Sequence, residues 1–406
     1  MKKQRKHFSL EKINNKKASI IVLAVAGVIF FGMLFWLYSE DILHGAGDIF
    51  WVYGEDELVE FEKGRVLAIQ SDDKRVDEVA DGAYVGTQEL LVAVKSGRYK
   101  GEEMTVYNYF GPLYGVPVEV GDSVTLTIKT HIDGKHSATV YEFNRIPVMG
   151  AFLLLFFGVT ILVGGRTGLK SLIGLTITVI CLFAILIPLL LKGAPTILTT
   201  FLTCAFISVV CFTILGGVHR KTISAFLGTI SGAFLAMLFG LTVQRIAKID
   251  GLRLEDAEPL LQLKYAGDIP VHLRGLLVAG VIISALGAVM DVAMSISSSL
   301  EEVHAANPSL ARNELFKSGM NIGRDMVGTM TNTLILAFLG SEFTLMIFLY
   351  SRGLTFYHLF STVFVTLETI SGLASSIGMI LAIPLTALIS ATLIAGKKKS
   401  GATKKR

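Results

Sequence analysis

Long apolar segments follow one another along most of this chain, and they constrain its fold more than any other feature. A helix rises 1.5 Å per residue, so about 20 apolar residues cross a hydrocarbon layer of about 30 Å. With 52% hydrophobic and only 17% charged residues, a soluble protein of this size is excluded. The sequence predicts a membrane α-helical bundle of about eight transmembrane helices, at Ala18 to Tyr38, Pro147 to Gly164, Ser171 to Leu191, Thr196 to Gly217, Ile223 to Val243, Leu273 to about Ser297, Asp325 to Tyr350 and Gly372 to Ala395.

Basic residues gather at both ends of the chain. Residues 1–17 hold seven Lys or Arg residues against Glu11, and residues 397–406 hold six more. Such tails also occur in nucleic-acid-binding proteins, but beside apolar spans they orient the chain, because segments rich in Lys and Arg stay in the cytoplasm. We expect both tails in the cytoplasm, near anionic lipid, and no nucleic-acid partner.

The first apolar segment, residues 18–38, has a cleaved signal peptide as its alternative interpretation. It is longer than the apolar region of such a peptide, and WLYSEDI at its end offers no small residues for cleavage. We therefore expect an uncleaved membrane anchor.

The composition changes to that of a soluble domain between residues 39 and 146. Short runs with strand-like alternation are separated by Gly and Asp turns. These runs are LVEFEKGRVLAIQ, QELLVAVK, MTVYNYF, SVTLTIKT and SATVYEF. The sequence predicts a small extracytoplasmic β-rich domain, either an OB-like barrel or a sandwich, followed by a multi-spanning membrane domain at residues 147–396.

One apolar stretch, Leu354 to Ile370, does not fit the count of spans. A ninth crossing here would place the basic C-terminal tail outside the cell. We expect an outer-surface or re-entrant helix instead.

Small residues recur at every fourth position of the segment Ile223 to Val243. In lipid, a ridge of small side chains lets another helix approach closely. We expect a helix-packing seam, which has a functional part only if the helices slide, at Ser224, Gly228, Gly232, Ala236 and Gly240.

Two neighbouring segments each carry an aspartate within a polar stripe. Steps of three or four residues place each stripe on one helix face. An Asp at the centre of a membrane helix costs about 2.5 to 3.5 kcal/mol on insertion scales, so it normally faces a partner or a water-filled cavity. The stripes are Ser284, Gly287, Asp291, Ser295, Ser298 and Glu302 in the first segment, and Asn321, Asp325, Thr329 and Asn332 in the second.

Three interpretations of these aspartates remain open. They hold helices together through hydrogen bonds or an ion pair with Arg324, or they form a lipid-headgroup or partner site, or they bind a proton or cation in a transporter. In the last case Asp291 and Asp325 carry the charge, and the neutral ligands are Asn321, Thr329, Asn332, Ser295 and Ser298.

The motifs of common enzymes are missing from this chain. It contains no Walker loop, no Gly-x-Ser-x-Gly elbow and no His-Glu-x-x-His motif, so we expect neither an enzyme nor a cofactor. The Gly-x-Gly-Asp motif of intramembrane aspartyl proteases is absent around both aspartates and occurs only at Gly45 to Asp48, outside any expected span. We interpret Glu301, Glu302 and His304 as solvated charges rather than metal ligands, and the three cysteines suggest no disulfide framework.

The runs GLLVAGVIISALGAVMDVAMSISSSLEEV, NPSL and SGMNIGRDMVGTMTNTLILAFLG resemble the YibE/F-like family of bacterial multi-spanning membrane proteins. The resemblance covers roughly Val148 to Ala395. It implies a bacterial cell membrane protein of the longer form, with an N-terminal anchor and an external domain. It implies no established catalytic or binding residue.

Two functional hypotheses follow. The first is a transporter or permease of a small solute or ion, with proton or cation coupling. The alternative is a non-transporting membrane scaffold or sensor, whose external β-domain binds an envelope partner or ligand. The expected partners are the lipid bilayer, a small solute or cation, and either a second copy of the chain or a sister membrane subunit.

Overall fold

The computed structural model of the protein describes residues 15, 17–33, 58–130, 136–254, 257–267 and 269–395. Most of both basic tails and the string Gly45 to Asp48 lie outside the described residues. The chain divides into two compact units, one formed by residues 1–40 and 163–406 and the other by residues 41–162.

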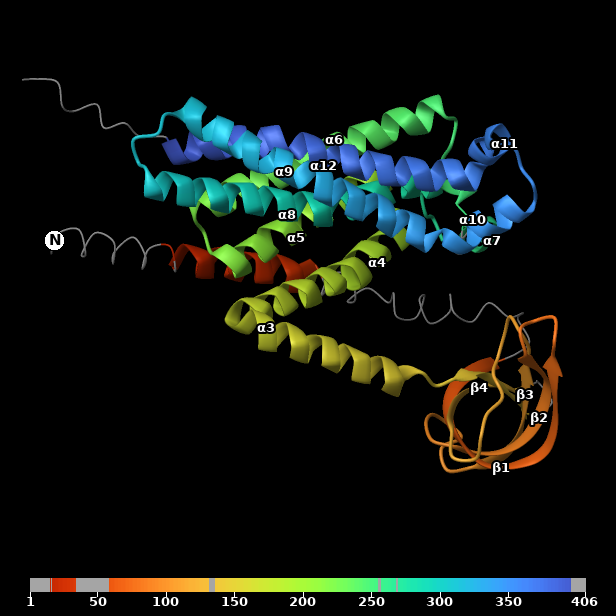
Figure 1. Ribbon diagram of the computed structural model, residues 1–406. Helices are drawn as coiled ribbons and strands as arrows, with labels where there is room; N and C mark the ends of the chain where they lie inside the picture. The colour runs from red at the N-terminus through yellow and green to blue at the C-terminus, as the bar shows by residue number, and fades with distance from the viewer. Residues whose placement is uncertain are drawn as a thin grey trace, which may run out of the picture. The chain divides into compact units, whose positions relative to one another are not determined.

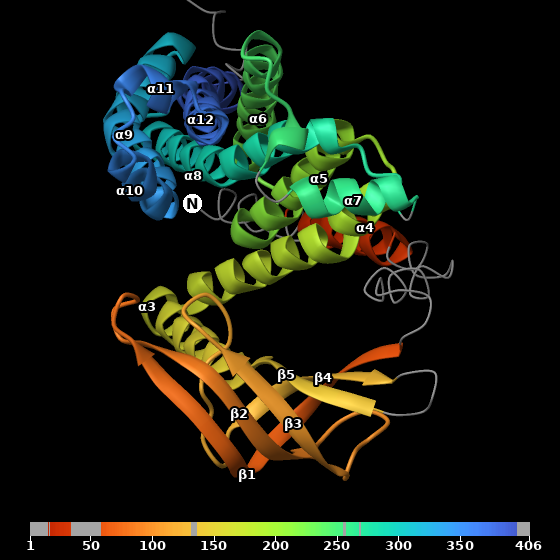
Figure 2. The same cartoon turned by 90° about the vertical axis from the view of Figure 1, so that its right-hand side faces the viewer.

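The smaller unit contains a closed barrel of five strands (Figure 2). Neighbouring strands follow the order β1-β2-β3-β5-β4, with β3 and β5 parallel and the other pairs antiparallel. The barrel interpretation is thus confirmed, and the sandwich is wrong. The strands are β1 Leu58–Asp77, β2 Ala83–Val94, β3 Glu103–Phe110, β4 Ser123–Thr130 and β5 His136–Phe143.

Two polar side chains inside the barrel complete their hydrogen bonds within it. The Asn108 amide donates to Gln88 Oε1 at 3.0 Å and to the carbonyl of Val116 at 3.0 Å. Gln88 in turn donates to the carbonyl of Val118 and accepts from its N–H. Because a buried amide without partners is costly, this network holds the loop after β3 to the barrel wall.

The larger unit is helical (Figure 1). Its elements are the helix Lys17–Met33, α3 Ile146–Cys181, which begins in the smaller unit, η1 Leu182–Leu186, α4 Ile187–Leu191, α5 Thr196–Gly216, α6 Arg220–Ile246, η2 Gly251–Arg253, α7 Ala257–Ala266, η3 Leu273–Gly275, α8 Leu276–Ala306, α9 Arg312–Ser341, α10 Phe343–Ser351, α11 Phe356–Ser361 and α12 Val363–Ala395.

The expected count of eight spans is not confirmed. Among the described residues, five helices are long and apolar enough to cross a membrane, or six if the bent pair α9 and α10 is one span, and Lys17–Met33 is a shorter apolar helix. Two expected spans fall in one stretch, Ile146–Leu191, of 46 residues. At 1.5 Å per residue it is roughly 70 Å long, about twice the hydrocarbon thickness, and its backbone is non-helical at Gly165.

The segment from Leu354 to Ile370 divides differently from the prediction. Only Phe356–Ser361 forms a separate short helix, α11, and the residues from Val363 onward are the first turns of α12. The last span was expected to start at Gly372, but its helix begins at Val363, so the predicted start was wrong. The prediction had excluded this segment from the spans because a ninth crossing would place the basic C-terminal tail outside, but an extension of the last helix adds no crossing.

α12 is the central helix of this unit and packs against α6, α8 and α9 (Figure 1). The small residues predicted to form a seam on α6 are all buried. A Cβ added at Gly228 would lie 2.1 Å from Thr386 Oγ1, and one added at Gly232 would lie 2.6 Å from Ala382 Cβ. The seam thus brings α6 close to α12.

Several helix ends meet at one end of the helical unit. The N–H of Val218, between α5 and α6, donates to Ser19 Oγ at 2.9 Å. Lys221 pairs with Glu301 near the end of α8 at 2.9 Å, and Arg220 donates to the carbonyl of Leu393 near the end of α12 at 3.4 Å. The start of Lys17–Met33, the α5–α6 turn and the C-terminal ends of α8 and α12 therefore share one end, as the predicted topology requires.

Candidate functional site

The two predicted aspartates lie on an antiparallel pair of helices. α8 ends at Ala306 and α9 begins at Arg312, so the two helices form a hairpin with a short turn. At 1.5 Å per residue, Asp291 and Asp325 each lie roughly 20 Å from that turn. The hairpin thus brings both carboxylates to the same depth.

Neither aspartate faces the core of the helical unit. Asp291 and Asp325 are exposed, whereas Val292, Ile296 and Gly323, which face other directions on α8 and α9, are buried. No hydrogen bond or ion pair joins either carboxylate, or Arg324, to another described residue. Of the neutral polar residues of the stripes, Asn321, Thr329, Asn332 and Ser295 are exposed and Ser298 is half-buried. Ser284 differs, because its hydroxyl lies 2.6 Å from Ser375 Oγ of α12 inside the helical unit.

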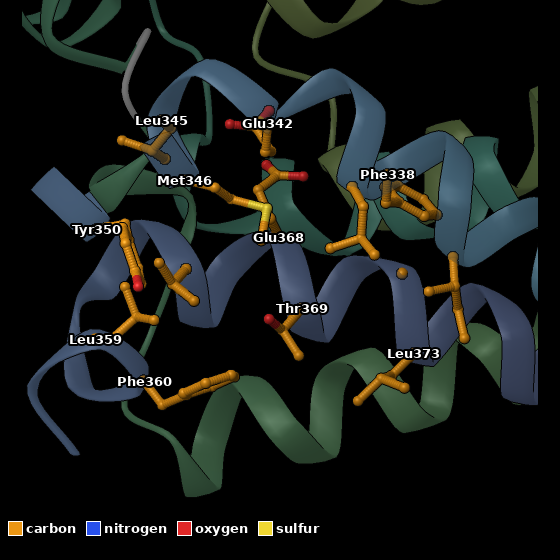
Figure 3. Close-up of a pocket in the computed structure, with 14 residues that line it drawn as sticks. Phe338, Glu342, Leu345, Met346, Tyr350, Leu359, Phe360, Glu368, Thr369 and Leu373 are labelled. Carbon is orange, nitrogen blue, oxygen red and sulfur yellow. The ribbon is translucent and has the colours of Figure 1, made fainter. Parts of the chain in front are cut away.

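A pocket elsewhere in the helical unit brings two other carboxylates together. Glu342 lies at the break between α9 and α10, and Glu368 lies on α12. Both line a pocket of about 270 Å³, and their carboxylates lie side by side in it (Figure 3). Both side chains are half-buried.

The rest of this pocket is almost entirely apolar. Thr369 and Tyr350 are the other lining side chains with polar atoms, and none of the 14 described lining residues is basic. The apolar lining comes from four helices and consists of Ile335, Phe338, Leu339, Leu345, Met346, Leu359, Phe360, Val365, Leu373 and the backbone of Gly372. Two carboxylates in such surroundings repel each other unless a proton or a cation offsets one charge.

A sharp bend places Glu342 at the pocket. The axes of α9 and α10 meet at 61°, and Glu342 is the residue between the two helices. Broken membrane helices are tolerated where the freed backbone groups are buried in protein or line a cavity. The break therefore supports the pocket as a built feature of the helical unit.

The sequence analysis did not select this glutamate pair. Each glutamate is a lone acidic residue in an apolar segment, which is a usable signal for function. Glu368 was missed because its segment was not placed in a span. That the two residues meet follows only from the packing of α9 on α12 and the bend that ends α9 at Glu342.

No metal centre is evident in the described part of the chain, where no group of three or more His, Cys, Asp or Glu side chains lies together. Glu301, once considered with Glu302 and His304, pairs with Lys221 instead. Cys181, Cys204 and Cys211 are buried free thiols within the helices.

Comparison with known proteins gives one match. A family model described as "YibE/F-like protein" matches residues 152–396, which comprise most of α3 and all later helices. No curated protein and no solved structure matches the chain.

Proposed function

The chain belongs to the YibE/F-like family, and from the geometry of its glutamate pocket we propose that it is a transporter of a small solute or ion, driven by a proton or cation, rather than an enzyme. One observation carries the proposal. Glu342 and Glu368 face each other in an apolar pocket beside a broken membrane helix.

Each part of this arrangement has a use in coupled transport. Acidic side chains within membrane helices are costly and are commonly found in proton relays and ion pathways. Transporters often bind substrate and coupling ion where a helix is discontinuous. A cation bound between Glu342 and Glu368 would draw α10 and α12 together, and its release would let the two carboxylates move apart.

We propose that the chain crosses a bacterial cell membrane eight times, with both termini in the cytoplasm. The break at Gly165 divides the stretch Ile146–Leu191 into two crossings, the bent pair α9 and α10 makes one, and Lys17–Met33 extends into the anchor. The cytoplasmic end is the one that holds Arg220 and Lys221, because basic clusters stay inside. The glutamate pocket then lies toward the outer side.

Carbodiimide labelling tests the pocket in the full chain. Dicyclohexylcarbodiimide dissolves in apolar surroundings and reacts with protonated carboxyls. We expect it to label Glu342 or Glu368 in native membranes, as located by mass spectrometry of peptides, with more label as the pH falls. Na⁺ should reduce the label if it is the coupling ion. Glu302→Gln, which removes an exposed α8 carboxylate, is the matched control and should leave the labelling unchanged.

Proton uptake into proteoliposomes under an imposed membrane potential tests transport itself. We expect uptake above that of empty liposomes, and its loss in Glu342→Gln and Glu368→Gln. Both variants should still elute as a single species in detergent. Uptake that persists in both variants would refute the coupling role of the pair. A protein whose proton and Na⁺ uptake both equal those of empty liposomes would argue against the transporter.

A second candidate function, a membrane scaffold or sensor, is favoured by the outer surface of the barrel. The strand register places Tyr107 beside Thr139, Thr139 beside Thr127 and Thr127 beside Phe61, so one outward row crosses four strands. Tyr107 and Phe61 are exposed, and Tyr141 packs edge-on against Phe61. Exposed aromatic side chains that gather on one surface are typical of binding sites.

The scaffold hypothesis makes a separate prediction. We expect the double variant Phe61→Ser with Tyr107→Ser to fail to rescue the cellular phenotype of a gene deletion, while its expression and transport activity remain. Glu103→Ser, at an exposed position of β3 away from this row, is the control. Full rescue by the double variant would count against the barrel as a binding domain.

A further inference from the structure

The outer faces of α8 and α9 carry charges of both signs that have no partner. Asp291, Arg324 and Asp325 are exposed, and the described part of the chain offers none of them a hydrogen bond or an ion pair. Ser295 and Asn332 are likewise exposed. In a single copy, all of these groups would face the surroundings of the helical unit.

Lipid is an unsuitable environment for these faces. α8 is one of the helices long and apolar enough to cross a membrane, and Asp291 lies near the middle of its length. Hydrocarbon cannot form hydrogen bonds, so charged side chains in membrane helices face protein or water. Another surface must therefore cover the faces that hold Asp291 and Asp325.

The glycines of these two helices indicate that the surface covering the faces is protein rather than water. Gly280, Gly287 and Gly328 are exposed, and a Cβ added at any of them would meet nothing within 4 Å. Packing inside the chain does not require glycine there. Small residues on an outer helix face allow close approach of a further helix in lipid. Gly287 lies one turn from Asp291 in the α8 stripe, and Gly328 lies three residues after Asp325.

The charges of these faces fit a second copy of the same chain. A two-fold axis along the membrane normal keeps every residue at its own depth in both copies. Arg324 is adjacent to Asp325 in the sequence, and Asp291 lies at the same depth across the hairpin. Arg324 of one copy therefore meets a surface at its own level that carries two carboxylates. A face with both signs at one depth is complementary to itself.

We propose that the chain forms a two-fold homodimer in the membrane through the outer faces of α8 and α9, with Arg324 of each copy opposite the carboxylates of the other. This dimer brings the polar stripes of two copies into one enclosed surface. The residues predicted from the sequence as neutral ligands, among them Asn321 and Thr329, then line the interface. Such a dimer forms whether or not the chain transports a solute.

Cysteine cross-linking in native membranes tests the interface. Gly287→Cys, Ser295→Cys and Thr329→Cys each place one thiol on these faces, while the native Cys181, Cys204 and Cys211 are buried. Copper-catalysed oxidation by oxygen should give a disulfide-linked dimer for at least one of the three variants. The control is Leu198→Cys, on an exposed apolar position of α5, which should remain monomeric.

Charge exchange tests the pairing. Two differently tagged copies, expressed together and solubilised gently, should co-purify. We expect Arg324→Asp to reduce co-purification at least tenfold, and the double variant Arg324→Asp with Asp325→Arg to restore most of it, because both signs are again present on the face. Both variants should elute as folded protein in detergent, since both residues are exposed and make no hydrogen bond or ion pair with another described residue.

Three results would overturn the homodimer. One is absence of both cross-links and co-purification for the native faces. Another is a cross-linked product whose mass shows a different protein, which would identify a sister subunit as the occupant. The third is co-purification that does not change in Arg324→Asp.

Discussion

The inner seam between α6 and α12 and the outer faces of α8 and α9 use the same residue types for opposite purposes. At the seam, glycine is required by close neighbours, as the 2.6 Å approach to Ala382 shows for Gly232. At the outer faces, Gly280 and Gly287 have no neighbour within 4 Å. Hydroxyls differ in the same way, since Ser297 is paired inside and Ser295 is exposed outside.

This difference separates what one copy of the chain completes from what it leaves incomplete. The seam satisfies its own packing, so its residues determine the stability of the single chain. Within the described part of one copy, no packing or pairing accounts for the small and charged residues of the outer faces. Substitutions there are therefore expected to affect the association of two copies. Substitutions matched across the two regions distinguish these roles.

The largest effect is expected from a large side chain at the seam. Gly232→Leu places its Cβ 2.6 Å from Ala382 Cβ and 3.1 Å from the carbonyl oxygen of Gly378, where the backbone cannot give way. We expect a loss of about 3 kcal/mol in the free energy of unfolding, measured by thermal or denaturant unfolding in detergent. Gly280→Leu, the control, should leave the monomer unchanged or more stable by up to about 1 kcal/mol. Equal losses of unfolding free energy in both variants would contradict the proposed difference between the seam and the outer faces.

A smaller effect is expected from the inner hydroxyls. Ser297 Oγ lies 3.0 Å from Ser390 Oγ, and both residues are fully buried. Ser297→Ala leaves the Ser390 hydroxyl without this partner and should cost about 1 kcal/mol in the same unfolding measurement. Ser295→Ala, two residues away on the outer face, should stay within about 0.5 kcal/mol. A larger loss for Ser295 would show that the monomer itself depends on the outer face.

The smallest effect is expected where the seam reaches the end of the helical unit. Lys221 and Glu301 pair at 2.9 Å, but both side chains are partly exposed. Lys221→Met should cost about 0.5 kcal/mol of stability at low salt. The loss should shrink as the salt concentration rises, because screening already weakens the native pair. A loss that does not depend on salt would indicate packing of the Lys221 stem instead.

Local pattern was sufficient for much of the fold. Strand alternation predicted five strands close to where they lie, since residues such as Val106 and Phe110 alternate with Tyr107 and Tyr109. Long apolar runs predicted most of the helices, and the ridge from Ser224 to Gly240 is buried. Pattern did not predict where helices continue or break. The predicted boundary at Gly164 is a kink at Gly165 rather than a loop, and no helix-breaking proline marks the early start of α12 at Val363.

The sequence by itself determined that this is a multi-spanning membrane protein of the YibE/F-like family with a small β-domain. Apolar length, strand alternation and family motifs are local properties, and lipid imposes them segment by segment. Only the tertiary structure decided which acidic residues meet. Periodicity places Asp291 and Asp325 on helix faces but does not say whether those faces point inward. The bend at Glu342 and the packing of α9 on α12 brought Glu342 to Glu368, since contacts between distant segments depend on how whole helices pack.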